Sequence, residues 1–228
     1  TLAANAASSV IKAAQQTWQH LVDFFKGKSD NSTFTLQNDI EQEVDDVDAV
    51  AAAGTNLTLD LNGFTIKLKR KITLNGTEFV LTDSSAAGNG QITGSTTGGI
   101  VVENGKFTMN GGNITGNTKQ GDGAGVEVKQ NGSFVMNDGM IAGNTAYKGI
   151  DANGNYTFGR DTDKTSRGGG VYVYGKDKEG NKKDKDSFIM HGGVIAGNTA
   201  GEGGGVYVNG VKANGYEPDY RKGETSHI

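Results

Sequence analysis

The sequence predicts an all-β fold in which coils of three short strands stack on one another after a helical N-terminal cap. Three observations lead to this prediction. Glycine accounts for 37 of the 228 residues and proline for only one, which indicates many tight turns. Short apolar segments alternate with period two between Asn-Gly pairs, as strands and turns do. From residue 100 onward, sequence signatures also return in a fixed order, which is typical of repeat architectures.

The first 53 residues are expected to form the cap. Residues 3–25 carry apolar side chains at helical spacing, and Gly27 is a natural stop. The segment 38–53 shows a shorter version of the same pattern, so we expect a second helix there. Its other side is strongly acidic, which favours a solvated face over the alternative of a metal site. We therefore divide the chain into a helical cap, 1–53, and a strand-rich domain, 54–228.

Three signatures define the repeat in the strand-rich domain. They are an aliphatic pair, a Phe-x-Met segment and an Ile-x-Gly-Asn-Thr segment. The Phe and the following Ile are always seven residues apart. The Ile and the next aliphatic pair are 12, 30 or 11 residues apart, and the pair and the next Phe are 7, 8 or 17 apart. One corner of fixed length and two that accept insertions describe a coil of three strands and three turns.

Within each strand, residues i and i+2 face the same side, so the Phe, Met, Ile and Val positions should form buried columns from coil to coil. Asn117, Asn144 and Asn198 fall at equivalent turns. An amide both donates and accepts hydrogen bonds, so these residues are expected to form an asparagine ladder along the stack. A row of ligand contacts is the alternative interpretation. A single coil buries too little apolar surface to stand alone, so the repeat must stack.

Composition excludes several classes of function. Lys plus Arg number 22 against 26 Asp plus Glu, a net charge of -4, which gives no support to nucleic acid binding. No apolar run approaches the ~18 residues of a membrane span. The absence of cysteine excludes disulfides, zinc–thiolate sites and a thiol nucleophile.

Two stretches carry a resemblance to a known family. The run LTLDLNGFTI at 57–66 is followed by coils of the form Gly-Gly-x-Ile-x-Gly-Asn-Thr-Ala and Gly-Gly-Gly-Val-Tyr-Val. Over roughly residues 55–210 this resembles the right-handed parallel β-helix repeat proteins of the pectate-lyase-like solenoid superfamily, common among secreted and surface proteins of Gram-positive bacteria. The resemblance implies a right-handed parallel β-helix at an extracellular or cell-surface location. The fold hosts lyases, hydrolases, adhesins and stalks alike, so it does not by itself select a function.

The C-terminal end of the chain matches the start of a further repeat. Residues 226–228 align with Ser187, Phe188 and Ile189, where the next Phe-x-Met strand would begin. We therefore expect the β-helix to be truncated at its C-terminal end and the chain to be the N-terminal piece of a longer protein. The alternative is a chain that is ordered only this far.

The outward strand positions offer no catalytic pair of carboxylates, and no catalytic residue is predicted. Asp122 lies at a variable corner without a matching acid. No cofactor is predicted either, although calcium is an alternative in the insertion. There, oxygen-bearing side chains alternate as they do in calcium loops. They are Asp151, Asn153, Asn155, Asp161 and Asp163. An Asx-rich turn is the interpretation we favour, because Tyr156 replaces the glycine that an EF-hand loop requires.

All seven tyrosines lie in the last 82 residues. We assign Tyr172, Tyr174 and Tyr207 as candidate partner-binding residues, because exposed aromatic rings suit contact with a glycan or a protein. The alternative is that tyrosine simply tolerates strand surfaces. The leading hypothesis is a non-enzymatic, secreted or cell-surface β-solenoid module that acts as an adhesin or stalk. The alternative is a polysaccharide lyase or glycoside hydrolase of the same fold.

Overall fold

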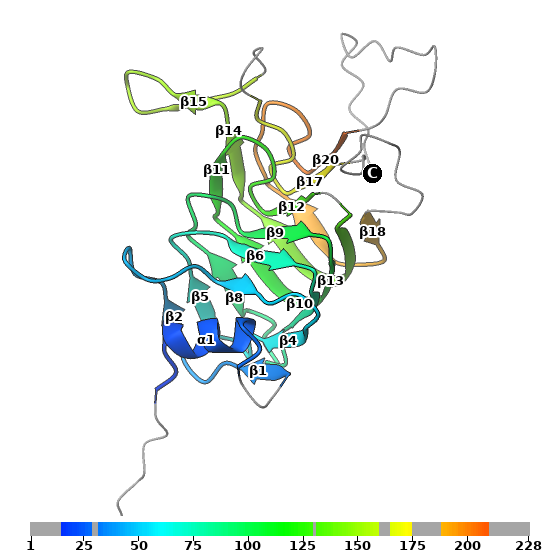
Figure 1. Ribbon diagram of the computed structural model, residues 1–228. Coiled ribbons are helices and arrows are strands. Elements are labelled where there is room, and N and C mark those ends of the chain that lie inside the picture. The colour runs from blue at the N-terminus through cyan, green and yellow to red at the C-terminus, as the bar shows by residue number, and fades with distance from the viewer. Residues whose placement is uncertain (1–14, 29–31, 130, 160–164, 175–187, 210–228) are drawn as a thin grey trace, which may run out of the picture.

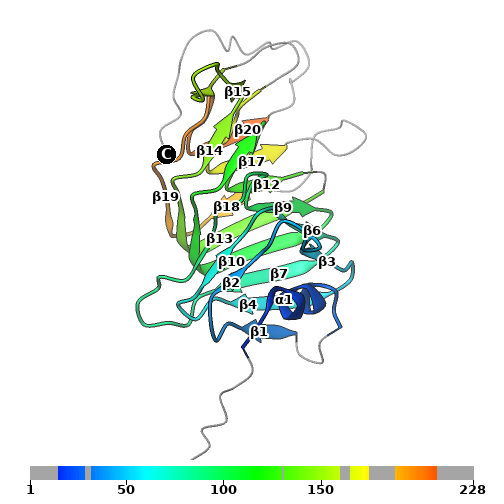
Figure 2. The same cartoon turned by 90° about the vertical axis from the view of Figure 1, so that its left-hand side faces the viewer.

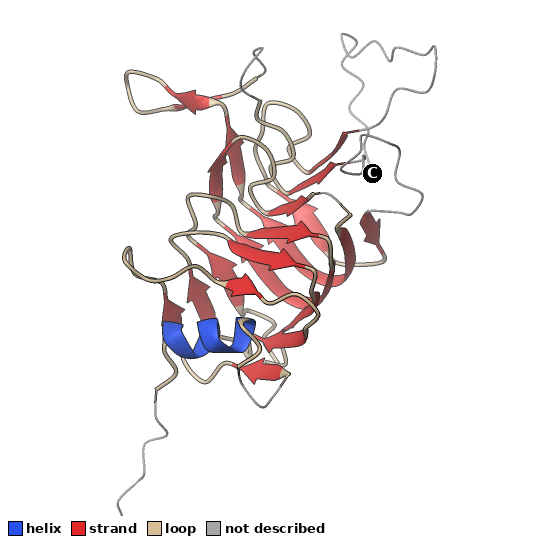
Figure 3. Cartoon of the chain, in the orientation of Figure 1, coloured by secondary structure: helices blue, strands red, loops and turns tan. Residues whose placement is uncertain are grey.

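A computed structural model describes residues 15–28, 32–129, 131–159, 165–174 and 188–209 of the chain. Among these residues the structure has one α-helix and 20 β-strands, and Figure 3 shows how strands dominate. Two curled sheets, one of ten strands and one of six, contain most of them, and their strands pair in parallel. The prediction of a mainly β, parallel fold is confirmed, and the curled sheets are compatible with a β-solenoid.

The ten-stranded sheet has two limbs that meet in the long strands β10 (Lys106–Thr115) and β13 (Ser133–Ala142). The start of β10 pairs with one limb and its end with the other. The first limb also contains β1 (Thr33–Thr35), β4 (Asn56–Asp60), β7 (Glu78–Thr82) and β18 (Phe188–Met190). The second also contains β2 (Ile40–Glu41), β5 (Thr65–Lys67), β8 (Gln91–Thr93) and β19 (Val194–Ala196).

The six-stranded sheet carries the aliphatic pairs. Its strands follow one another in chain order, as Figure 1 shows. They are β3 (Val50–Ala51), β6 (Ile72–Asn75), β9 (Ile100–Glu103), β12 (Val126–Val128), β17 (Val171–Tyr174) and β20 (Val206–Asn209). Two smaller sheets pair β11 (Thr118–Gln120) with β14 (Thr145–Tyr147), and β15 (Gly149–Ile150) with β16 (Tyr156–Thr157). The second of these is an antiparallel hairpin.

The predicted columns of apolar side chains are confirmed by the strand register. Met136 pairs with Met109 on one side and with Met190 on the other. The rings of Phe107 and Phe134 stack with centroids 4.7 Å apart, and Phe188 continues the column at 5.2 Å from Phe134. Such offset ring contacts add stabilisation beyond that of the buried area. The Ile and Val positions are likewise in register.

The predicted asparagine ladder is also confirmed. The Asn117 backbone N–H and side-chain amide both donate to the side-chain oxygen of Asn144, each at 3.0 Å. Asn144 donates in the same way to Asn198, at 3.0 and 2.9 Å. Asn117 and Asn144 are fully buried, so these bonds satisfy polar groups that water cannot reach.

The helix prediction holds only in part. Residues 3–14 lie outside the described residues, and α1 spans Trp18–Phe25. Thr17 and His20 form a capping box at its start. The apolar side of α1 is buried against the first strands, and the Phe25 ring lies 5.7 Å from that of Phe79. Figures 1 and 2 place α1 at one end of the stack. None of the described helices is long and apolar enough to cross a membrane.

The prediction of a second helix over 38–53 is wrong. This segment forms β2 and β3, which pair in parallel with β5 and β6. Ile40 and Gln42 are buried while Glu41 between them is exposed, which is the period of a strand. The side-chain oxygen of Gln42 accepts hydrogen bonds from the backbone of Lys69 and Arg70. Pairing with the next strands therefore overrides the helical spacing, and the domain boundary at residue 54 stays a prediction.

Candidate functional site

Two of the candidate tyrosines form a ring pair on the six-stranded sheet. Tyr172 on β17 and Tyr207 on β20 are in register, and their rings are nearly parallel, at 5° and with centroids 5.8 Å apart. The Arg167 guanidinium carbon lies 5.2 Å from the Tyr172 ring centroid and 5.1 Å from that of Tyr207. A guanidinium at this distance is attracted to the ring faces. The three residues therefore form one cluster, in which Arg167 orders both rings.

Asp122 fixes the position of Arg167. The Arg167 Nη2 donates to Asp122 Oδ2 at 2.6 Å, and the Arg167 backbone N–H donates to Oδ1 at 2.9 Å. Burial alone would lower the pKa of Arg167, but the hydrogen bond and charge of Asp122 outweigh it, so the pKa is raised. Planar charge-assisted pairs of this kind are strong and directional. Asp122, for which the sequence offered no partner, is thus held across the insertion by a residue 45 positions away.

The sequence does hold a signal for this pair. Asp122, Arg167 and Glu202 each stand four residues before the first valine of an aliphatic strand, so they occupy equivalent positions in successive repeats. Arg167 and Glu202 form a parallel β-bridge. The charges at these three positions alternate in sign. The pattern is hard to see in the sequence because insertions of different lengths separate the three residues.

The prediction that Tyr172 is exposed is wrong. Only 4% of its surface is accessible, while Tyr174 and Tyr207 are half-buried. Burial raises the pKa of Tyr172 to about 12, although the charge of Arg167 acts in the opposite direction. Of these three tyrosines, Tyr174 and Tyr207 are therefore the ones that a partner could reach, and Tyr172 supports the ring of Tyr207.

The outer face of this sheet is covered rather than exposed. Val101 on β9 and Glu127 on β12, which continue the register of Tyr172, are only 1% and 7% accessible. The Lys119 ammonium pairs with the Glu127 carboxylate, and both side chains are largely buried. Burial lowers the pKa of Lys119, and the charge of Glu127 partly offsets this. Lys119 lies on β11 and Glu127 on β12, so the alternation along a single strand does not show that they meet.

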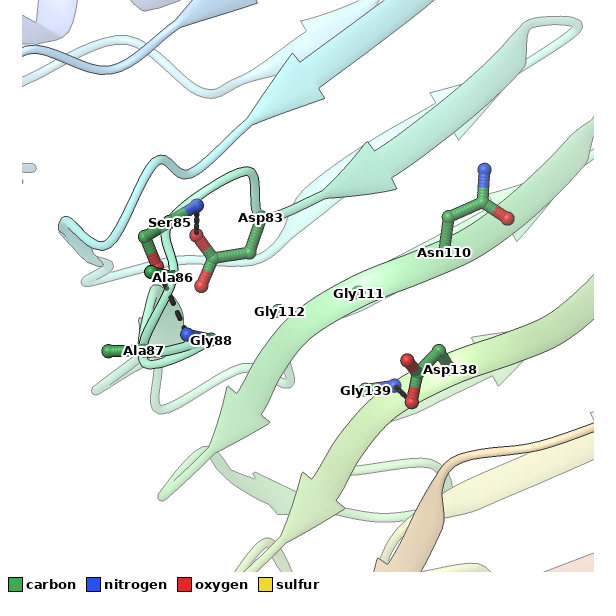
Figure 4. Close-up of a pocket in the computed structure, with 10 residues that line it drawn as sticks. All are labelled: Asp83, Ser85, Ala86, Ala87, Gly88, Asn110, Gly111, Gly112, Asp138 and Gly139. Carbon is green, nitrogen blue, oxygen red and sulfur yellow. Dashed lines mark hydrogen bonds between the residues drawn. The ribbon is translucent and has the colours of Figure 1, made fainter.

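A shallow polar pocket of about 340 Å³ lies at the fixed corner of the coils. Figure 4 shows Asp83 and Asp138 on either side of the β10 segment that carries Gly111 and Gly112. Asp83 accepts backbone hydrogen bonds from Gly63, Ser85 and Gly90, at 2.8, 3.1 and 2.6 Å. Burial would raise the pKa of Asp83, but the hydrogen bonds from Ser85, Gly90 and Gly63 outweigh it and lower the pKa.

Asp83 is therefore held in the ionised form and organises the loop from 83 to 90. Asp138 is exposed and accepts a hydrogen bond from the Gly139 backbone at 2.7 Å. The two carboxylates differ in kind, because one is saturated by backbone donors and the other faces solvent.

The first calcium candidate forms an Asx turn. The Asp151 carboxylate accepts hydrogen bonds from the backbones of Asn153 and Asn155, at 2.9 and 2.8 Å. The hydrogen bonds from Asn155 and Asn153 lower the pKa of Asp151. They close the β15–β16 hairpin, as an Asx turn does. Asp161 and Asp163 lie outside the described residues. Within the described part of the chain, no group of three acidic or histidine side chains is placed to hold a metal ion.

No known family, curated protein or solved structure matches the chain.

Proposed function

We propose that the chain is a right-handed parallel β-helix with three strands per coil, serving as a non-enzymatic stalk or adhesive module at the cell surface. One observation supports the β-helix part of this proposal. The strands β7, β8 and β9 follow one another along the chain, and each pairs with its counterpart in the next repeat. Those counterparts are the start of β10, the end of β10, and β12. Three consecutive strands that all find their partners one repeat later make a coil.

A stack of this kind suits a rigid spacer. Each coil adds ~4.8 Å along the stack, the spacing of neighbouring strands. The inner columns run along the stack, and the asparagine ladder links the repeats of Asn117, Asn144 and Asn198. The β15–β16 hairpin meanwhile leaves the body at one of the tolerant corners, as Figure 1 shows. Changes in the loops can thus alter the contact surface while the stack is kept, which is what an adhesive module requires.

Engineered cysteines test the coil directly, because the chain has none of its own. One pair is placed in each of the three columns of strands: Thr108 with Val135, Thr115 with Ala142, and Asn75 with Glu103, all register partners. Partners on neighbouring strands lie within the ~4.4–6.8 Å between Cα atoms that a disulfide bridges. All three variants should oxidise within one chain. The control pair, Val80 with Val135, is two strands apart and should stay reduced. Electron density of the chain decides the hand of the coil.

We propose that Tyr207 and Tyr174 contact the partner, a glycan or a protein, with Tyr172 and Arg167 as their support. The half-buried Tyr207 ring rests on Tyr172, which fixes its orientation and lowers the entropy lost on binding. Glycan and protein arrays with the whole chain would identify the partner. Tyr207→Ala should then weaken binding at least about tenfold, the range of an aromatic hot spot, while Tyr147→Ala, in the insertion, serves as the matched control. Equal binding by both variants would contradict the assignment.

The alternative function, a polysaccharide lyase or glycoside hydrolase, has one observation in its favour. Asp83 and Asp138 flank the polar pocket, and paired carboxylates are the catalytic groups of most glycosidases. Incubation with acidic and neutral glycans, with and without calcium, separates the two proposals. New reducing ends or unsaturated products that disappear in Asp138→Asn would replace the stalk proposal with an enzymatic one.

A further inference from the structure

The last described coil presents an apolar edge. We call β18, β19 and β20 together the open edge. Each pairs with a neighbouring strand on one side only, among the strands that the structure describes. Met190 and Val208 are 43% and 57% accessible, whereas Met136 and Val173, one coil earlier in the same columns, are 0% and 2% accessible. The inner columns therefore continue to this edge and are uncovered there.

The asparagine ladder also reaches the open edge, and its hydrogen bonds keep the same donor-to-acceptor direction up to Asn198. Asn198 accepts two hydrogen bonds from Asn144 and donates its side-chain N–H to the Ile141 carbonyl at 2.8 Å. Asn117 and Asn144 each pass their backbone N–H on to the next asparagine. Within the described part of the chain, the Asn198 backbone N–H has no acceptor. The ladder thus offers a donor at the position where the next amide oxygen would lie.

The two ends of the stack differ in how the core is covered. At the first end, α1 covers the core with Trp18, Phe24 and Phe25. Proteins usually protect an exposed strand edge with charged residues, proline or a covering element. The ten residues of the open edge include no charged residue and no proline. An edge that is apolar and without such protection is a template for another strand.

We propose that the open edge binds a strand-forming segment of this same repeat type. The segment lays its Phe-x-Met residues over Phe188 and Met190, and its Ile over Ile195. Its asparagine accepts the hydrogen bond of the Asn198 backbone N–H and donates to the Ile195 carbonyl. These contacts continue an interface that the chain already makes, because β13 lies on β10 in this way and β18 and β19 lie on β13. The inference does not depend on the proposed stalk function.

A second copy of the described stack cannot be the occupant. At its N-terminal end β1, β2 and β3 also pair on one side only, but they carry no Phe-x-Met segment and no ladder asparagine, and α1 packs over the core there. Its own open edge would face this one in the opposite direction, and the strands would pair antiparallel. The donor of Asn198 would then not meet the side-chain oxygen of an equivalent asparagine, and the ladder could not continue.

A disulfide capture experiment tests the proposal in the full chain. Ile189→Cys places the only cysteine on the outward side of β18, where Val135 is its register partner. The probe is a synthetic peptide with the sequence of residues 133–146 and a cysteine at the Val135 position. In a glutathione buffer the mixed disulfide should form at least about tenfold more with this peptide than with one that has cysteine at the Asn137 position, because only the first register fits both the columns and the ladder.

Two controls separate recognition from thiol chemistry. Thr108→Cys lies on a strand already paired on both sides and should capture no peptide. A peptide with serine at the Phe134 and Met136 positions should be captured by Ile189→Cys no better than the out-of-register peptide. Equal capture of all peptides, or disulfide-linked dimers of the chain in place of peptide adducts, would overturn the proposal.

A measurement without any substitution in the chain guards against a misfolded variant. With the natural chain and an excess of the unmodified peptide, hydrogen exchange at the Asn198 backbone amide should slow at least about tenfold, because the amide gains an acceptor. The amide of Gly154, in the distant hairpin turn, should exchange at an unchanged rate. Unchanged exchange at Asn198 under saturating peptide would exclude the binding mode.

Discussion

The side-chain oxygen of Asn144 accepts two hydrogen bonds from Asn117, one from its backbone N–H and one from its amide, each at 3.0 Å. Asn144 also donates to the Ile114 carbonyl at 2.9 Å. The Asn144 side chain thus satisfies buried polar groups of Asn117 and Ile114, which belong to the preceding repeat. We expect Asn144→Ala to lower the free energy of unfolding by about 3 kcal/mol, since it leaves buried donors and acceptors unpaired.

Denaturant unfolding monitored by far-UV circular dichroism measures this loss. The matched control is Asn137→Ala, which removes a 2.8 Å bond to Asn110 at the exposed surface. Its effect should stay below about 1 kcal/mol. Similar losses in the two variants would mean that burial does not decide the strength of the ladder.

Glycine at position 125 is required for the coils to approach one another. A Cβ there would lie 2.5 Å from the Gly170 carbonyl oxygen of the next coil and 2.9 Å from Ile141 Cγ2. We expect Gly125→Ala to destabilise the chain by about 2–3 kcal/mol, because the coil must shift to admit the methyl group. Gly154→Ala meets nothing within 4 Å, and its positive φ should cost only about 1 kcal/mol. Thermal unfolding of both variants provides the comparison, and a smaller loss at Gly125 would contradict it.

Tyr172 should be the source of an alkaline transition. Its pKa is raised from 10.0 to about 12 in the folded chain, so its stabilising contribution is complete below pH 10. That contribution is lost as the pH rises through about 12, because the unfolded chain then releases the proton more readily. Absorbance titration of phenolate should show one tyrosine ionising near pH 12, a step that Tyr172→Phe removes. A titration curve unchanged by this substitution would contradict the burial of the hydroxyl group.

We expect Asp83 to contribute stability that is lost at acidic pH. Its pKa is lowered below 3.8 by hydrogen bonds from Ser85, Gly90 and Gly63, so its contribution is complete above that pH. It is lost as the pH falls through the folded-state pKa. Asp83→Asn should therefore be less stable than the natural chain at pH 7, and the difference should shrink between pH 4 and pH 2. Denaturant unfolding at these pH values measures it. A difference that stays constant would mean that the carboxylate charge plays no part.

The stacked repeat could be predicted from the sequence because it depends on local spacing. Phe and Ile are separated by seven residues in every copy, and this fixed corner brings both columns into register. The segment 38–53 could not be predicted in the same way. Ile40, Val44, Val47 and Ala51 fit a helical period, yet Val44 and Val47 are 70% and 50% exposed. Only pairing with strands further along the chain decides which of them are buried.

The sequence allows only part of the Tyr–Arg cluster to be predicted. Tyr172 and Tyr207 each stand between the two valines of an aliphatic pair, so they share one position in the repeat, and their ring centroids lie 5.8 Å apart. The position of Arg167 against the two rings could not be predicted. Arg167 is held by Asp122, and an insertion between the two residues hides their equivalent positions in the repeat. Burial of an outward-facing side chain depends on what the loops lay over it, and the strand pattern carries no information about that.

The position of α1 has a consequence for biosynthesis. Because α1 covers the core at the end of the stack that is synthesised before the later strands, each later repeat can pack on strands that are already present. Coils such as those of Asn117 and Asn144 are only 27 residues apart along the chain, so each can dock soon after it emerges. The chain can thus fold vectorially, with its N-terminal helix as the starting template.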